Sequence, residues 1–143
     1  MTAAIGEAVT EADRAACLAL RLEVFCGEQG VRRAEEIDGL DDAARHLLAR
    51  AGGEAAGTLR LRMTGETATI ERVCVARAHR GAGLGSALMG EALRVAAEAG
   101  ARRAQLGAQT AVLRFYERLG FAAHGPEYLD ARIAHRTMTR PLP

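Results

Sequence analysis

The sequence predicts an α+β fold: a mixed, mostly antiparallel sheet with flanking helices, formed by residues 1–143 as a single domain. Two observations lead to this prediction. Apolar stretches between residues 46 and 75 are separated by short glycine-containing turns, a pattern typical of antiparallel hairpins. Residues 83–98 have the apolar spacing of a helix and precede another strand-like segment, so the strands on either side of this helix should run parallel.

The N-terminal segment is expected to fold as a strand, a helix and an acidic loop. Residues 3–9 favour a strand, and residues 10–24 favour a helix that begins with a threonine as N-cap. Gly27 and Gly30 should break this helix. Residues 35–42 are acidic and lack periodicity, so we expect a loop that either covers the substrate end of a cleft or lies in solvent.

The middle of the chain is expected to form strands around one long helix. Residues 46–50 and 55–63 predict a hairpin around a Gly-Gly turn, and residues 67–75 predict a third antiparallel strand. The helix over residues 83–98 should be closed by a glycine, after which residues 103–108 return to the sheet. This last connection is the parallel crossover.

The C-terminal part begins with an aromatic helix. Thr110 is a suitable N-cap for a helix that continues to Leu119 and ends at Gly120. Phe121 should then enter a strand, and a last strand should begin near Ile133.

A glycine-rich turn at residues 80–86 joins a strand to the helix that follows it. The first turn of a helix leaves amide N–H groups unpaired, and glycines let an anion approach them closely, so this junction suits a phosphate group. A P-loop is excluded because no lysine follows the glycines. The dinucleotide-binding fingerprint is incomplete, because Ser86 occupies the place of its third glycine and no acidic residue follows at the required distance.

The turn has the pattern Arg-x-x-Gly-x-Gly, with Arg80, Gly83 and Gly85, and this resembles the coenzyme A pyrophosphate loop of the GNAT superfamily of N-acetyltransferases. Residues 115–121, Phe-Tyr-Glu-Arg-Leu-Gly-Phe, are similar to the second signature of that superfamily. The order and spacing of the two segments also match. Further segments resemble its ElaA-like branch, namely residues 21–29, Asp38, Asp41, His46, residues 58–62, residues 70–73, residues 108–109 and residues 133–135.

The resemblance implies that acetyl-CoA is the cosubstrate and that the two parallel strands splay apart to admit its pantetheine arm. The residues that the resemblance places around acetyl-CoA are Val73, Cys74, Val75, Arg80, Gly81, Ala82, Gly83, Leu84, Gly85, Ser86, Gln109 and Tyr116. The residues that it places in a substrate pocket are Phe25, Glu28, His46 and His135. The arginine of the loop would add charge-assisted contacts to the phosphates.

The implied reaction is the direct attack of a primary amine on the thioester within a ternary complex, and a strand amide near Cys74 would stabilise the oxyanion. Tyr116 carries a phenol that can protonate the departing sulfur. Glu71 is the first candidate for the general base, although an ion pair with a neighbouring arginine explains this glutamate equally well. His46 and His135 are further candidates to receive the proton.

A covalent route through Cys74 is disfavoured. Strand alternation places Ile70, Arg72 and Cys74 on one face, and no histidine follows at an activating distance in the sequence. Two other functions are compatible with a glycine-rich turn before a helix. A non-catalytic acyl-CoA sensor or interaction module is the alternative, and a nucleotide-binding oxidoreductase is disfavoured by the incomplete fingerprint.

Composition sets the remaining limits. The chain has 19 basic residues, all arginine, and 18 acidic residues, and the balanced charge without a basic stripe argues against a nucleic-acid or membrane partner. Its 3 cysteines are scattered, which predicts a cytoplasmic protein with no metal site. The acidic residues between positions 28 and 42 favour a cationic acceptor, either a small-molecule amine or a peptide amine. A homodimer is possible.

Overall fold

The computed structural model describes residues 3–143. Its centre is a seven-stranded sheet in the order β1-β2-β3-β4-β5-β7-β6. All neighbouring strands are antiparallel except β4 and β5, so the mixed, mostly antiparallel sheet is as predicted. The strands are β1 (Ala3–Glu7), β2 (Arg45–Ala51), β3 (Glu54–Thr64), β4 (Thr67–Val75), β5 (Arg103–Gln109), β6 (Ala122–Asp130) and β7 (Ile133–Pro141).

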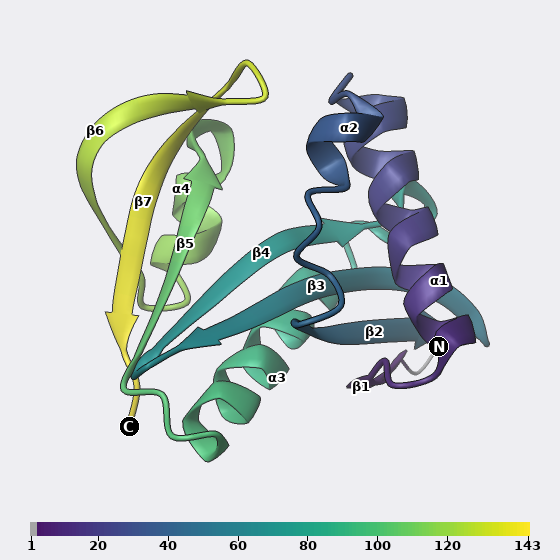
Figure 1. The fold of residues 1–143 in the computed structure, drawn as a ribbon, viewed down its shortest axis with the longest axis horizontal. Helices are drawn as coiled ribbons and strands as arrows, with labels where there is room; N and C mark the ends of the chain where they lie inside the picture. Colours follow the sequence, from purple (N-terminus) through teal and green to yellow (C-terminus); the bar gives the residue numbers. More distant parts are fainter. Residues whose placement is uncertain (1–2) are drawn as a thin grey trace.

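Helices cover both faces of the sheet. Figure 1 shows α1 on one face and α3 on the other, and two separate apolar cores fill the space beneath them. The helical segments are α1 (Glu11–Arg21), its π-helical continuation η1 (Leu22–Glu28), α2 (Arg33–Glu36), η2 (Arg77–His79), α3 (Leu84–Glu98), η3 (Thr110–Val112) and α4 (Leu113–Glu117).

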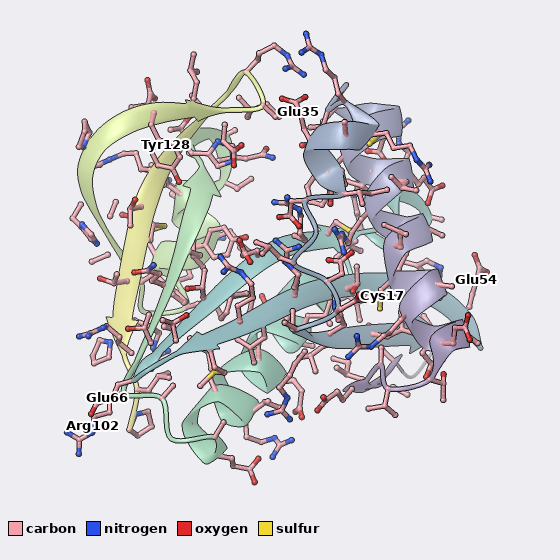
Figure 2. The ribbon with its side chains drawn as sticks, in the orientation of Figure 1. Cys17, Glu35, Glu54, Glu66, Arg102 and Tyr128 are labelled. Carbon is pink, nitrogen blue, oxygen red and sulfur yellow. The ribbon has the colours of Figure 1, made fainter. Side chains whose placement is uncertain are left out.

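The parallel strands β4 and β5 separate soon after they meet. They pair only where residues 67–69 lie opposite residues 103–105. Beyond this point they diverge as a V, and β5 continues with β7 and β6 as a separate arm (Figure 1). The amide of Arg102 donates to the carbonyl of Glu66 at 2.7 Å at the closed end of the V, where Figure 2 labels both residues. The splayed strands that the family resemblance implies are therefore present.

A β-bulge in β4 changes which side chains share a face. The register between β3 and β4 shifts at Arg72, whose φ of +57° is unusual for a residue other than glycine. As a result Ile70 packs into the core under α3, whereas Cys74 packs into the core under α1. The prediction that Ile70, Arg72 and Cys74 lie on one face is wrong, because the extra residue reverses the alternation.

One of the two predicted helix N-caps is present in the structure. At the start of α1, the side chain of Thr10 accepts a hydrogen bond from the amide of Asp13 at 3.1 Å, as predicted. Thr110 does not cap a helix. The chain leaving β5 first makes the 3-10 turn η3, which contains Thr110, and α4 begins after Val112. Gly120 ends this helical segment with a φ of +90°, which a glycine adopts without strain.

Candidate functional site

A cleft of about 510 Å³ lies between the diverging arms of the sheet. One side is formed by β4 with η1 and α2, and the other by β5, β7 and β6. Figure 2 labels Glu35 beside α2 and Tyr128 on the β6 arm, at the open end of the V. The site residues predicted from the sequence that line the cleft are Phe25, Glu28, Glu71, Val73, Cys74, Val75, Arg80, Gln109, Tyr116 and His135.

The glycine-rich turn presents free amides at the start of α3. Gly81 and Gly83 have φ values of +87° and +80°, and a Cβ at either position would meet no atom within 4 Å. The first backbone hydrogen bond of the helix runs from the amide of Ala87 to the carbonyl of Gly83 at 3.1 Å. The amides of residues 84–86 therefore have no acceptor within the helix, and this open cradle fits a phosphate group.

Gly85 has a different role from the two glycines before it. A Cβ at this position would lie 3.3 Å from the ring of Phe115 and 3.9 Å from a methyl group of Val75. The absent side chain thus lets α3 pack closely against α4 and the end of β4. In this turn, Gly81 and Gly83 shape the anion cradle, whereas Gly85 is needed for close packing.

Arg80 connects the cradle to the opposite helix. Its Nε donates to the carbonyl of Val75 at 2.9 Å, and its guanidinium lies 2.8 Å from the carboxylate of Glu28 in η1. Arg77 is more exposed and lies 3.7 Å from the same carboxylate. A phosphate group arriving at this place would meet two arginines that share one acidic partner.

Tyr116 lines the cleft and is largely buried. Its ring makes edge-on contacts with Phe115 and Phe121, at centroid distances of 4.9 and 6.1 Å. Burial raises the pKa of the Tyr116 phenol to about 12. The hydroxyl therefore keeps its proton at neutral pH and is available as a donor.

The Cys74 side chain packs under α1 and not beside the cradle. It shares the apolar core with Cys17, Leu20 and Val24. Burial raises the pKa of the Cys74 thiol to about 12, so the thiolate needed for nucleophilic attack is disfavoured. Cys74 still lines the cleft as part of β4, although its side chain packs into the core under α1.

Glu71 belongs to an ionic cluster between β4 and the α1–β2 connection. Arg60 lies 3.1 Å from Glu71, and Arg62 donates to both oxygens of the same carboxylate. These two ion pairs give Glu71 the structural role that the sequence allows as the alternative to a general base. The members of the ionic cluster are Arg21, Arg60, Arg62, Arg72, Glu36, Asp38, Asp41 and Glu71.

The predicted acidic loop is only partly a loop, because its first residues form α2. Asp38 binds Arg60 through both oxygens at 2.8 Å, and hydrogen bonding from Arg60 holds the pKa of Asp38 well below its usual range. Burial opposes the ionisation of Asp41, but hydrogen bonds from Arg21 and Arg60 outweigh it and lower its pKa. These carboxylates are neutralised within the protein, so they contribute little free charge to attract a cationic substrate.

The two predicted histidines lie in different places. His46 is 3% exposed, does not line the cleft, and its Nε2 lies 2.9 Å from the carbonyl of Asp41. The expectation that it forms part of a substrate pocket is thus not supported by its position, because β2 lies two strands away from the gap. His135 does line the cleft. Gln109 also lines it and donates to the side chain of Gln29 at 2.9 Å.

Among the residues of the cleft wall that sequence reasoning missed are Arg72, Gly107 and Tyr128. Nothing local in the sequence marks them, since the positions of all three depend on strand register. Within residues 3–143 no group of three or more histidine, cysteine or acidic side chains is arranged to hold a metal ion. Over the same residues, none of the helices has the length and apolar character needed to cross a membrane.

Comparison with known proteins gives a consistent result. The sequence model of the acetyltransferase (GNAT) family matches residues 6–121. The uncharacterized N-acetyltransferase YjcF of Bacillus subtilis is 38% identical over 122 residues, which cover 85% of this chain and 87% of that protein. An acyl-CoA N-acyltransferase from Pseudomonas aeruginosa has a similar structure, with a TM-score of 0.87 and 33% identity over 97% of this chain and 99% of that one. Escherichia coli ElaA gives a TM-score of 0.86 with 28% identity and the same coverage.

Proposed function

Because the chain belongs to the acetyltransferase (GNAT) family, we propose that it transfers the acetyl group of acetyl-CoA directly to a primary amine. The observation that carries this proposal is the gap between β4 and β5 together with the unpaired amides at the start of α3; Arg80 lines the cleft and directly precedes the residues that present these amides, although residues 81–86 do not themselves line it. A gap and a cradle in this arrangement offer backbone contacts to an extended chain that ends in phosphates.

The binding of acetyl-CoA is assigned to two groups of residues. The amides of residues 81–86 and the side chain of Arg80 would hold the pyrophosphate. The backbone of residues 73–75 and the side chain of Gln109 would contact the pantetheine arm. Arg80 now pairs with Glu28, so the phosphates would compete with this carboxylate for the guanidinium.

The chemical step is proposed to occur in a ternary complex without an acyl-enzyme. The buried thiol of Cys74 supports this route, because its raised pKa makes it a poor nucleophile. Acetyl-CoA supplies an activated carbonyl carbon, and Tyr116 donates a proton to the departing sulfur. A strand amide of Cys74 or Val75 would stabilise the charge that develops on the carbonyl oxygen.

The acceptor is proposed to be a small-molecule or peptide amine that enters at the open end of the V. Phe25, Glu28 and His135 all line the cleft and are the side chains proposed to meet the amine. Glu71 stays a prediction as a general base. We further propose one domain over residues 1–143 that works in the cytoplasm, where its three free cysteines would remain reduced.

Calorimetric titration with acetyl-CoA tests the binding site. Gly83→Val introduces a β-branched residue at a φ of +80° in the cradle, and affinity should fall roughly 10-fold or more because strain of about 1–3 kcal/mol must be relieved by moving the loop. Gly90→Ala is the matched control, since Gly90 lies on the exposed side of α3 with no atom within 4 Å of an added Cβ. Unchanged affinity in a folded Gly83→Val protein would contradict the proposed cradle.

A screen of thiol release over amines tests the transfer. Suitable acceptors are spermidine, Nα-acetyl-lysinamide, phenylethylamine and lysine-containing peptides. The chain contains no lysine, so any acetyl-lysine found in a reaction with a peptide must come from the acceptor. Tight binding of acetyl-CoA without release of thiol to any acceptor would favour the alternative of a non-catalytic acyl-CoA sensor.

A further inference from the structure

The wall of the cleft formed by β5, β7 and β6 carries a histidine with a defined orientation. Strand pairing places His135 opposite Gln109 on one side and opposite Tyr128 on the other. Paired residues of neighbouring strands point to the same face of a sheet, and all three line the cleft. His135 therefore faces the gap in which the acyl group would lie.

Two contacts hold the ring of His135. The ring of Tyr128 stacks on it with a centroid distance of 5.7 Å and an interplanar angle of 23°. Nδ1 lies 2.7 Å from the carbonyl oxygen of Ile133. The stack fixes the plane of the imidazole, and the hydrogen bond fixes its rotation within that plane.

The hydrogen bond also determines where the proton sits. A carbonyl oxygen can only accept, so Nδ1 of His135 must carry the hydrogen in its contact with Ile133. In the neutral imidazole Nε2 then has the lone pair. The hydrogen bonds among residues 3–143 give Nε2 no partner, which leaves a basic nitrogen on a residue that lines the cleft.

The position of the stack depends on Gly107 of β5. A Cβ at Gly107 would overlap the hydroxyl oxygen of Tyr128, whereas the next ring atom, Cζ, would be 3.6 Å away. The tyrosine can therefore lie across β5 and against His135 only because position 107 has no side chain. Gly107 and Tyr128 are positioning residues for the histidine.

Glu71 is less suited to accept a proton. Both of its oxygens already accept hydrogen bonds from Arg62, and Arg60 binds one of them. Glu71 and His135 line the same cleft. The carboxylate of Glu71 is bound by two arginines, whereas Nε2 of His135 has no hydrogen-bond partner among residues 3–143.

We propose that His135 is the general base of the acetylation, an inference that rests on the proposed function. Nε2 takes one proton from the alkylammonium, and the resulting amine forms the C–N bond as the C–S bond breaks. Tyr116 gives its proton to the sulfur and regains one from the nitrogen, while His135 returns its proton to solvent. The two protons lost by the ammonium group are thereby accounted for.

The ionisable groups around His135 come from several elements. On β6 they are Tyr128 and Asp130, whereas β5 presents Gly107 and Gln109 and η3 presents no ionisable side chain. The other ionisable groups that line the cleft are Glu71 and Arg72 of β4, Glu28 of η1, Glu35 and Glu36 of α2, Arg80, and Tyr116 of α4. A step in the pH profile that is present in the parent and absent in His135→Gln, but retained in the control variant, is assigned to the imidazole.

The first test replaces the base. His135→Gln should lower kcat with spermidine or Nα-acetyl-lysinamide roughly 100-fold, the usual contribution of a general base, and should remove the rise of kcat/KM with pH. Acetyl-CoA affinity should stay unchanged. His124→Gln is the matched control, because His124 lies on β6 and does not line the cleft. A His135→Gln enzyme within about threefold of the parent, with the pH rise retained, would overturn the proposal.

The second test uses the contact between Gly107 and Tyr128. Gly107→Ala should lower kcat roughly 10-fold with unchanged acetyl-CoA affinity, because the displaced tyrosine no longer orients the base. Tyr128→Phe removes the overlapping oxygen but keeps the ring that stacks on His135, so it should restore most of this loss in the double variant. Absence of recovery in a folded double variant would contradict the positioning role.

Two outcomes separate the failure of this inference from that of the proposed function. If the wild type acetylates an amine and His135→Gln does so equally well, only the inference fails. If the wild type binds acetyl-CoA but acetylates nothing, the proposed function fails and the inference falls with it. Long-range ¹H–¹⁵N spectra of the histidine rings give an independent check, with the Nδ1–H tautomer expected for His135 and the Nε2–H tautomer contradicting the proposal.

Discussion

The two halves of the cleft are built from different groups. The half proposed to hold acetyl-CoA, here called the carrier half, is formed by the end of β4 and the adjoining residues 80–86, and it offers mainly backbone amides and glycines. The acceptor half, formed by η1, α2, the middle of β4 and the β6–β7 arm, offers side chains whose charges are mostly paired with one another. One half is suited to a constant ligand, and the other can differ between proteins that share the fold.

This difference predicts that variants in the two halves fail in different ways. Loss of a buried arginine from the ionic cluster should affect stability first. Arg60 is completely buried and contacts Asp38, Asp41 and Glu71, so Arg60→Met leaves three carboxylates without their shared partner. We expect a loss of about 3–5 kcal/mol in the free energy of unfolding.

Urea unfolding measures this loss. Arg62→Gln is the control, since Arg62 is 34% exposed and contacts only Glu71 of the ionic cluster. It should lower stability by about 1 kcal/mol or less. Equal effects of the two substitutions would show that burial of Arg60 has no special role.

Removal of the Tyr116 hydroxyl should affect turnover and leave stability nearly unchanged. Tyr116→Phe keeps the ring contacts with Phe115 and Phe121, and we expect kcat to fall roughly 10- to 1,000-fold. The phenol of the parent has a pKa of about 12, so it stays protonated and should cause no loss of activity as pH rises to about 10. Thiol release between pH 7 and 10 checks both statements. Full activity of Tyr116→Phe would exclude the phenol as the proton donor.

Acid should lower the free energy of unfolding by protonating aspartates of the ionic cluster. The pKa values of Asp38 and Asp41 are lowered in the folded protein, so their stabilising effect is complete above the ordinary aspartate range near pH 4 and is lost as pH falls through the folded values. Urea midpoints measured between pH 7 and 3 should decrease accordingly. Asp38→Asn should reduce this dependence, and an unchanged dependence would mean that other carboxylates cause it.

The smallest effect is expected at the turn between β6 and β7. Arg132 lies 3.1 Å from Glu35 of α2, but half of its side chain is exposed. Arg132→Ala should therefore change the free energy of unfolding by less than about 1 kcal/mol. Its effect on KM for the amine can be larger than its effect on stability, because the contact bridges the open end of the cleft. A stability loss above 2 kcal/mol would contradict the assignment of this pair as a surface contact.

The carrier half could be predicted from the sequence because its signals are local. Gly83 combines a positive φ with the start of a helix, and both follow from residues that are neighbours in the chain. The acceptor half depends on register. The bulge at Arg72 could not be predicted, because no glycine or asparagine marks the position of its positive φ. The close contact between Gly107 and Tyr128 joins β5 and β6, which are neighbours in the sheet only through β7. Thr110 illustrates the same limit, because the chain leaving β5 makes a 3-10 turn over Thr110–Val112 before α4 begins.

Hydrogen exchange of backbone amides with and without acetyl-CoA tests the central claim most directly, because that claim concerns main-chain donors. We predict slower exchange at residues 73–75 and 81–86 when acetyl-CoA is bound, with little change along β1 and β2. Protection confined to other segments, or unchanged exchange at the cradle with acetyl-CoA bound, would contradict the account.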